Sequence, residues 1–198
     1  ARWRIGNANP LAGSHCPHPG PLTQAYPDKL KTIFYTTPSG RFCHTDKQHT
    51  GNIYNVTDLA FADLLLDAYK NFYQSKGRKD AGVGDWCSNF AVSFGICDTY
   101  LRTVDVIDHP VVKKLNLITP ADLSRGDDAV MANVYGRFYQ YIARRLQQEL
   151  PGKKFYILAY YNSRFPSLDP QWRLPDNVEV NLCDFHLPIQ VYNKKAMG

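Results

Sequence analysis

Acidic and polar side chains follow three apolar segments of this 198-residue sequence, at the point where each segment ends. The run NFAVSFGICDTY leads to Asp98, VEVNLCDFH leads to Asp184 and His186, and KFYILAYYN leads to Tyr160 and Tyr161. If these segments are neighbouring parallel strands, their carboxyl ends meet at one edge of a sheet, where ligands bind. An acid held there by an apolar strand could act as a general acid, because apolar surroundings raise the pKa of a carboxyl group.

Other polar and aromatic side chains extend this predicted site. His15 lies in the loop GSHCPH, Asn55 lies in the segment NIYNVT, and Trp86 could stack on the flat face of a ligand, as could Trp172. Acids, histidines, amides and tyrosines are the residue types that line sites for sugars and other polar metabolites.

Simpler explanations stand beside each of these functional ones. An aspartate after a strand often caps a turn, because its carboxylate accepts backbone N–H groups. Tyr160 and Tyr161 are adjacent, so in a strand they face opposite ways and only one is expected to reach the site. His15 and His186 are equally compatible with ordinary loop or core-edge histidines, and the tryptophans with packing residues.

Histidines and cysteines also gather in the stretches HCPH and CHTDKQH, which leaves a metal-dependent hydrolase as an alternative. Zinc takes such ligands, but neither stretch has a recognised ligand spacing, so we expect no metal and no cofactor. The sequence has no glycine-rich phosphate loop and no Gly-x-Ser-x-Gly elbow, which disfavours phosphoryl and acyl transfer.

The order of the predicted elements indicates an α/β fold in a single domain covering residues 1–198. Six segments read as strands: RWRIGN, TIFYTT, NIYNVT, FAVSFGI, KFYILAY and VEVNLCDF. Helical spacing of apolar residues predicts helices over about 58–74, capped by Thr57, and 128–150, capped by Asp127 and ended by Pro151-Gly152. A strand-helix-strand succession implies a parallel sheet. A hairpin is expected at Pro38-Ser39-Gly40, and a long loop over 99–126.

The composition limits the classes of partner. Lys and Arg number 23 against 18 Asp and Glu, a formal charge of +5, but the basic residues come in scattered pairs, so we expect no nucleic acid. No stretch is long and apolar enough for a membrane span. Five widely spaced cysteines predict neither a disulfide framework nor a zinc ribbon.

Several stretches of the chain resemble a bacterial glycoside-hydrolase-like family of unknown function, which is similar to alpha-glucuronidases and is built on a (β/α)8 TIM barrel. These stretches are GSHCPHPGPL, AYPDKLKTIFYTTPSGRF, NIYNVTD, AVSFGICD, MANVYGRFYQYIARRLQQELPGKKFYILAYYNSRFP and LPDNVEVNLCDF. The helix followed by PGKK, a strand and AY is the most specific of them. The resemblance implies a parallel (β/α) barrel, of which this chain would supply about half the strands as part of a longer protein.

The resemblance also implies a function and roles for the site residues. Asp98 stands at the position of the family's strand-end aspartate, and His15 in its Gly-Ser-His loop. The expected activity is hydrolysis of a polysaccharide or glycoconjugate by two carboxyl groups, Asp98 and Asp184. The substrate-binding residues would be His15, Asn55, Trp86, Tyr160, Tyr161 and His186. The alternative is a non-catalytic carbohydrate-binding or cell-surface module. We expect an exported protein with further domains in the same chain.

Overall fold

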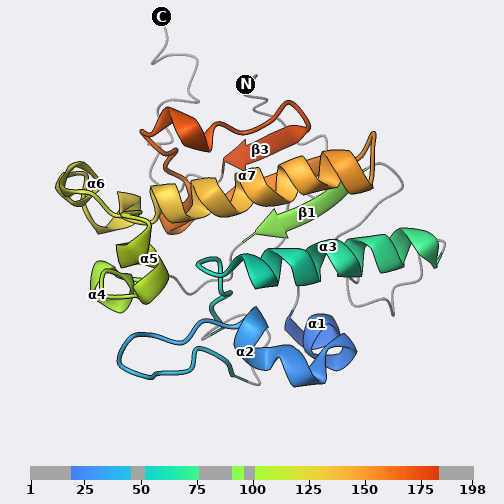
Figure 1. The fold of residues 1–198 in the computed structure, drawn as a ribbon, viewed down its shortest axis with the longest axis horizontal. Coiled ribbons are helices and arrows are strands. Elements are labelled where there is room, and N and C mark those ends of the chain that lie inside the picture. Colours follow the sequence, from blue (N-terminus) through green and yellow to red (C-terminus); the bar gives the residue numbers. More distant parts are fainter. Residues whose placement is uncertain (1–18, 46–51, 76–90, 96–100, 183–198) are drawn as a thin grey trace, which may run out of the picture.

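The computed structural model describes residues 19–45, 52–75, 91–95 and 101–182, and about half of these residues are helical. In chain order the elements are α1 (Pro19–Ala25), η1 (Pro27–Lys29), α2 (Leu30–Ile33), α3 (Leu59–Gln74), β1 (Ala91–Gly95), α4 (Thr103–Val106), α5 (Pro110–Lys114), α6 (Pro120–Ser124), η4 (Asp127–Ala129), α7 (Ala132–Glu149), β2 (Lys154–Ala159), η5 (Tyr161–Ser163), η6 (Pro170–Trp172) and β3 (Val178–Leu182) (Figure 1). The elements labelled η are single turns of 3-10 helix.

The three strands form one parallel sheet in the order β1-β2-β3. Gly95 pairs with Leu158 and Ala159 pairs with Leu182, so the three carboxyl ends lie nearly level. Helix α7 joins β1 to β2, as the crossover between parallel strands requires. The predicted α/β class and parallel sheet are therefore confirmed. The described residues form this small sheet and do not close it into a barrel.

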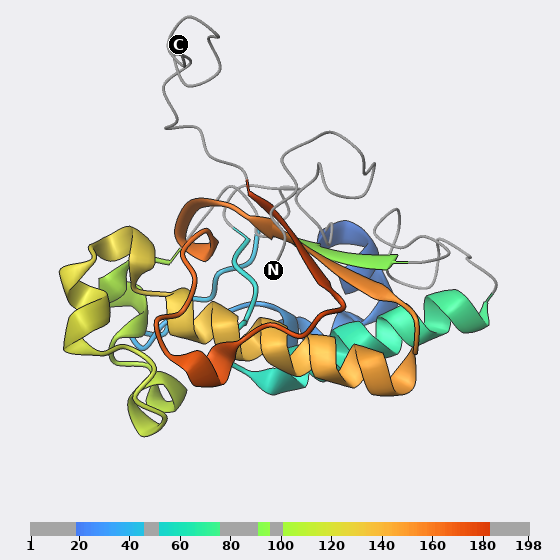
Figure 2. The same ribbon diagram turned by 90° about the horizontal axis from the view of Figure 1, so that it is seen from above.

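Helices α3 and α7 cover one face of the sheet (Figure 2). Helix α3 begins after Asp58, whose carboxylate accepts a hydrogen bond from the Ala60 N–H at 2.9 Å, so the cap lies one residue beyond the predicted Thr57. Helix α7 begins at Ala132, later than predicted, because Asp127 belongs to the separate turn η4. Within the described residues, no helix has the length and apolarity needed to cross a membrane.

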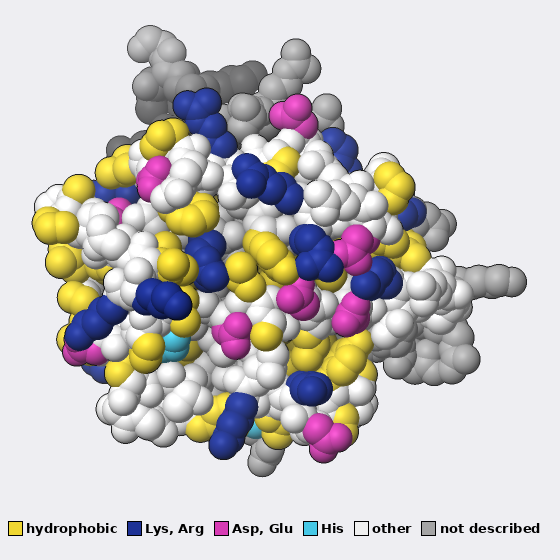
Figure 3. Space-filling model, in the orientation of Figure 1, with side chains coloured by type: hydrophobic (Ala, Val, Ile, Leu, Met, Phe, Trp, Pro, Cys, Tyr) yellow, Lys and Arg dark blue, Asp and Glu magenta, His cyan; other side chains and the backbone are white. Residues whose placement is uncertain are grey.

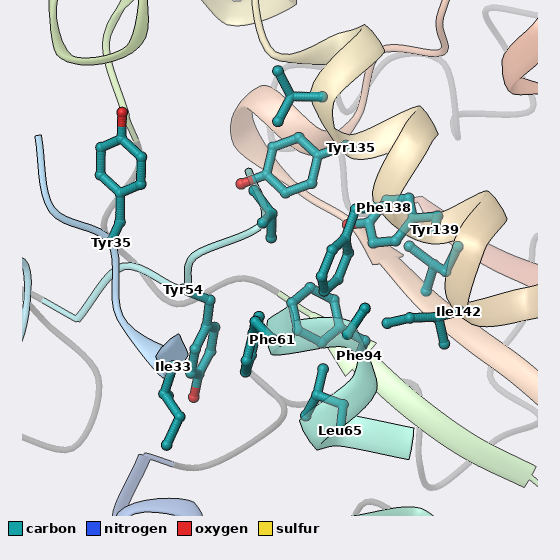
Figure 4. Close-up of a cluster of buried hydrophobic side chains, with 14 of the residues drawn as sticks. Ile33, Tyr35, Tyr54, Phe61, Leu65, Phe94, Tyr135, Phe138, Tyr139 and Ile142 are labelled. Atoms are coloured by element: carbon teal, nitrogen blue, oxygen red, sulfur yellow. The ribbon is translucent and has the colours of Figure 1, made fainter. Parts of the chain in front are cut away.

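Stacked aromatic rings hold the helices to the rest of the core (Figure 4). The ring of Tyr54 stacks between Phe34 and Phe61, with centroid distances of 5.7 and 5.4 Å. Phe61 in turn stacks on Phe138 of α7 at 5.7 Å, and Phe94 of β1 contacts both of these rings. The aromatic residues of five separate segments therefore form one continuous core cluster.

Two of the predicted strands are not strands of the sheet. The segments TIFYTT and NIYNVT meet only through an isolated antiparallel bridge between Phe34 and Tyr54, and Ile33 ends helix α2. The predicted hairpin is confirmed by a second bridge, between Thr36 and Phe42, and by Gly40, whose φ of 86° suits glycine in a tight turn. The first predicted strand, RWRIGN, lies outside the described residues.

The predicted loop over 99–126 contains three short helices, α4, α5 and α6, from residue 103 onward. Helices α5 and α6 each begin with a proline, a residue favoured in the first helical turn. At the start of α6, Thr119 and Asp122 cap each other reciprocally. Figure 1 shows the arrowheads of β1 and β3 pointing toward the side of the molecule that carries these helices. The insertion therefore lies at the carboxyl edge of the sheet.

Charged side chains connect the outer surfaces of α3 and α7. Arg145 donates to Asp63 Oδ1 at 2.9 Å and to Glu149, and Lys70 donates to Glu149 Oε2 at 2.9 Å. Tyr141 donates to Asp63 Oδ1 at 2.6 Å. Acidic and basic side chains alternate over these helices in Figure 3, which matches the scattered basic pairs of the sequence.

Candidate functional site

The predicted site residues divide into two groups. Asp98, Asp184, His15, Trp86 and His186 lie outside the described residues. The structure describes Asn55 and Tyr160, together with the backbone of Tyr161. The strands that precede the two acids are described, and their ends at Gly95 and Leu182 flank the end of β2 at the same edge of the sheet.

The chain turns sharply where β2 ends, and Ser163 holds that turn. The Ser163 hydroxyl accepts a hydrogen bond from the Tyr160 N–H at 3.0 Å and donates to the Tyr160 carbonyl at 2.8 Å. The Ser163 N–H also donates to the Tyr160 carbonyl at 3.0 Å. Tyr160 is buried, so it lies against the core at the edge predicted for the site.

Asn162 connects this turn to the segment that follows β1. Its Nδ2 donates to the Leu101 carbonyl at 2.9 Å, and the side chain is fully buried. Its Oδ1 is buried and has no hydrogen-bond partner within the described chain. A buried amide oxygen without a partner is costly, and such groups in native proteins commonly mark a functional site or a bound molecule. Asn162 therefore holds a buried acceptor without a described partner at the carboxyl edge.

Tyr139 of α7 adds a phenol beside the same turn. Burial raises the pKa of Tyr139 well above its usual value, and the neighbouring Ser163 hydroxyl offsets this rise only in part. Its hydroxyl completes no hydrogen bond of normal geometry with the described residues. Tyr139 therefore stays neutral at physiological pH, so it can donate or accept a hydrogen bond but cannot serve as a base.

Asn55 lies in the turn that leads into α3 rather than at the end of a sheet strand. Its Oδ1 accepts a hydrogen bond from the Thr57 hydroxyl at 2.7 Å, and its N–H donates to the Ile33 carbonyl at 2.9 Å. The structure therefore shows Asn55 and Tyr160 in different environments and does not bring them together as one described cluster.

A buried carboxylate that sequence analysis overlooked lies in α4, beyond β1. Asp105 is only 8% exposed, and it pairs with Arg41 at 3.0 Å and with Arg102 at 3.2 Å. The Tyr35 hydroxyl donates to its backbone carbonyl at 2.9 Å. Burial alone would raise the pKa of Asp105, but the hydrogen bonds from Arg102 and the charges of Arg102 and Arg41 outweigh burial and lower it. Asp105 is therefore a fixed anion rather than a proton donor.

The described histidine and cysteine side chains favour packing over nucleophilic or metal chemistry. Cys43 is buried, and burial raises the pKa of its thiol, so the thiolate is disfavoured. His44 stacks on Phe34 at 4.2 Å, and its Nδ1 lies 2.9 Å from Asn52 Oδ1. Over the described ranges, no three potential ligands gather in one place. Of the two predicted groups, His15, Cys16, His18 and His49 fall outside those ranges.

The overlooked residues carry different amounts of signal in the sequence. Asp105 lies in a segment whose composition predicts a loop, although the spacing from Arg102 to Asp105 suits the first turn of a helix. Tyr139 belongs to the predicted helix, but helical spacing alone does not show which strand end it will meet. Ser163 follows the turn residues directly and is the easiest of the three to suspect.

Comparison of the chain with protein-family models, with curated proteins and with solved structures finds no match. Its function therefore has to be inferred from the chemistry of the strand ends and their surroundings.

Proposed function

We propose that this chain is a carbohydrate-active domain that hydrolyses glycosidic bonds in a polysaccharide or glycoconjugate. Asp98 and Asp184 would be its carboxyl pair, on a (β/α) barrel that further chain would complete. The main support is the strand order, because the strands that precede both acids end at one edge with β2 between them. The ends of these two outer strands are two strand spacings apart, about 9.5 Å.

The chemistry at the edge suits a sugar better than a strongly charged ligand. The buried polar groups there, the amide of Asn162 and the neutral phenol of Tyr139, carry no charge, and such groups hydrogen-bond well to hydroxyls. Asp105 already has both arginine partners, so it adds no free charge. His15, Asn55, Trp86, Tyr160, Tyr161 and His186 are proposed as further substrate contacts.

The proposal is tested by incubating the longest natural form of the chain with a panel of glycosides and measuring product release. The panel includes uronic and sialic acid conjugates. We expect cleavage by the parent and a loss of about 10³-fold or more in Asp98→Asn and Asp184→Asn, because each change removes an acid-base group. Asp108→Asn is the matched control, since Asp108 is an exposed carboxylate paired with Lys113. Full turnover in a folded Asp98→Asn variant would refute the assignment. Saturable binding without cleavage would instead identify a sugar-binding module.

A further inference from the structure

A pocket of about 340 Å³ lies between α6, the start of α7 and the connection from β2 to β3. We call it the Trp172 pocket. Its walls come from residues 115–119, from Asp122 of α6, from Asn133 of α7 and from residues 168–172. The volume lies at the lower end of the roughly 300–1,000 Å³ that small-molecule sites occupy. A ligand of one or two rings would fill it.

The floor of the Trp172 pocket is held rigidly by one buried pair. Asp122 Oδ2 accepts hydrogen bonds from the Thr119 N–H at 2.9 Å and from Asn133 Nδ2 at 2.9 Å. Asn133 Nδ2 also donates to the Leu117 carbonyl at 3.0 Å, and its Oδ1 accepts from Ser167 at 2.5 Å. Because one amide joins three chain segments, the pocket is formed before any ligand arrives.

The charges of the Trp172 pocket disfavour an anionic ligand. Its carboxylates, Asp122 and Asp169, would repel an anion. Arg125 lies 3.9 Å from Asp122 and compensates part of that charge. Asp169 accepts hydrogen bonds from the Gln171 N–H at 2.9 Å and from Gln171 Nε2 at 2.5 Å.

The rim combines exposed apolar surface with a free amide. Leu115 and Leu168 line the pocket and are 44% and 62% exposed, unusually open for leucine, while Trp172 is half-buried. The Asn116 side chain is exposed and makes no hydrogen bond with any described residue. A sugar ring presents the matching surfaces, an apolar face for the leucine and indole groups and hydroxyls for amides.

We propose that the Trp172 pocket binds a neutral sugar of one or two rings, through the amides of Asn116 and Gln171 and the apolar surfaces of Leu168 and Trp172. The choice of a sugar rests on the proposed function. The residues that bind it are not those proposed to cleave it, so the two proposals can fail separately.

A titration of the full chain with neutral sugars tests this site. The sugars are glucose, galactose, N-acetylglucosamine and cellobiose, and binding is followed by NMR of the Trp172 indole and of the Asn116 and Gln171 side-chain amides. Glucuronic acid serves as the anionic probe. At least one neutral sugar should give saturable shifts, and glucuronic acid should bind about fivefold or more weakly than glucose because of the pocket carboxylates.

Two variants with a matched control locate the binding. Asn116 has a φ of 47°, which glycine accepts, so Asn116→Gly removes the amide without straining the backbone. Combined with Leu168→Ala, it should weaken sugar binding about tenfold or more. Leu123→Ala, on an α6 residue that is 43% exposed but does not line the pocket, should leave affinity unchanged.

Three results would overturn the proposal: no shift with any neutral sugar, equal affinity in the Asn116→Gly, Leu168→Ala double variant, or tighter binding of glucuronic acid than of glucose. Asp98→Asn separates this proposal from the proposed cleavage. If that variant loses hydrolysis but keeps these shifts, both proposals stand. Suppose instead that Asp98→Asn loses sugar binding and the pocket double variant keeps it. The sugar then binds at the strand ends, and the proposal for the Trp172 pocket is wrong.

Discussion

Gly136 of α7 and Trp172 of η6 lie so close that a β-carbon added to Gly136 would be 3.0 Å from the Trp172 β-carbon. It would also be 3.3 Å from the β-carbon of Ser167. Glycine in a helix interior is destabilising by about 1 kcal/mol relative to alanine. Here it allows the connection from β2 to β3 to lie directly on the helix, where Gln140 Nε2 donates to the carbonyls of Gln171 and Arg173.

Gly136→Ala should therefore destabilise the protein in spite of the better helix propensity of alanine. We expect the free energy of unfolding to fall by about 1–3 kcal/mol, as in other overpacked sites, and the Trp172 indole signal to shift in NMR spectra. Gly20→Ala is the matched control, because Gly20 is also helical and has open space around its α-carbon. The free energy of unfolding of the Gly20→Ala variant should be unchanged or rise by up to about 1 kcal/mol. A stabilised Gly136→Ala variant would show that the connection does not pack on α7 in this way.

Asp105 should make stability depend on pH in the acid range. Its pKa is lowered in the folded protein from the ordinary value of 3.8, so its contribution is complete above about pH 5. The stabilisation by Asp105 is lost as the pH falls below 3.8 and through the pKa of the folded protein. The reason is that Asp105 is protonated at a higher pH in the unfolded chain than in the folded protein. Asp105→Asn should lower the free energy of unfolding by about 1.5–3 kcal/mol at pH 7, since hydrogen bonds to charged groups are the stronger ones.

The difference between the parent and Asp105→Asn should narrow as urea unfolding is repeated from pH 5 down to pH 3. Asp108→Asn provides the control, because that carboxylate is 64% exposed and an exposed ion pair contributes at most about 1 kcal/mol. A difference that stays constant over this pH range would mean that Asp105 contributes through packing and not through its charge.

Sequence pattern located the elements whose apolar residues are periodic and long, and it misplaced the short ones. Helices α3 and α7 and all three strands follow from their hydrophobic spacing, because each buries a continuous face. The segment TIFYTT has strand-like composition, yet Phe34 and Tyr54 form only a single bridge, and their rings also stack at 5.7 Å. Local composition does not encode such tertiary packing.

The candidate site was predictable to the extent that topology determines it. Parallel strands bring their carboxyl ends to one edge, so the neighbourhood of Tyr160 followed from the order of elements. The hydrogen bond from Asn162 to the Leu101 carbonyl did not follow from that order. It joins residues 61 positions apart, and the segment of Leu101 has no hydrophobic periodicity. The Trp172 pocket was equally hidden, since its walls come from α6, the start of α7 and two connecting segments, which the Asp122 and Asn133 pair joins.

Substitution of Phe138 should lower stability more than the other changes considered, because Phe138 is fully buried, stacks on Phe61 and contacts Phe94. Phe138→Ala removes a large side chain and leaves a cavity, which should lower the free energy of unfolding by about 3–5 kcal/mol in urea. Val104→Ala, at an α4 position that is 68% exposed, should change it by less than about 0.5 kcal/mol. Equal costs for the two changes would contradict the aromatic cluster as the centre of the core.

Two neighbouring arginines of α7 should differ in how much they stabilise the contact with α3. Arg145 bonds to Asp63 of α3, to Tyr141 and to Glu149, and Glu149 also holds Lys70 of α3. Arg144 is the adjacent, exposed residue and makes no hydrogen bond or ion pair with the described residues. Arg145→Met should lower the free energy of unfolding by about 1 kcal/mol, because a network of partly exposed ion pairs exceeds an isolated pair only modestly.

Arg144→Met should change stability by less than about 0.5 kcal/mol, which controls for helix propensity and apolar side-chain length. The difference between the two variants should shrink when urea unfolding is repeated in about 1 M salt, because exposed charges are screened there over about 3 Å. If Arg145→Met lowers stability by the same amount at high salt, Arg145 stabilises α7 by packing along Tyr141 and not by its ion pairs. The centroid of the Tyr141 ring lies 5.6 Å from the Arg145 Cζ. Equal costs for both arginines would remove the network as a link between the two helices.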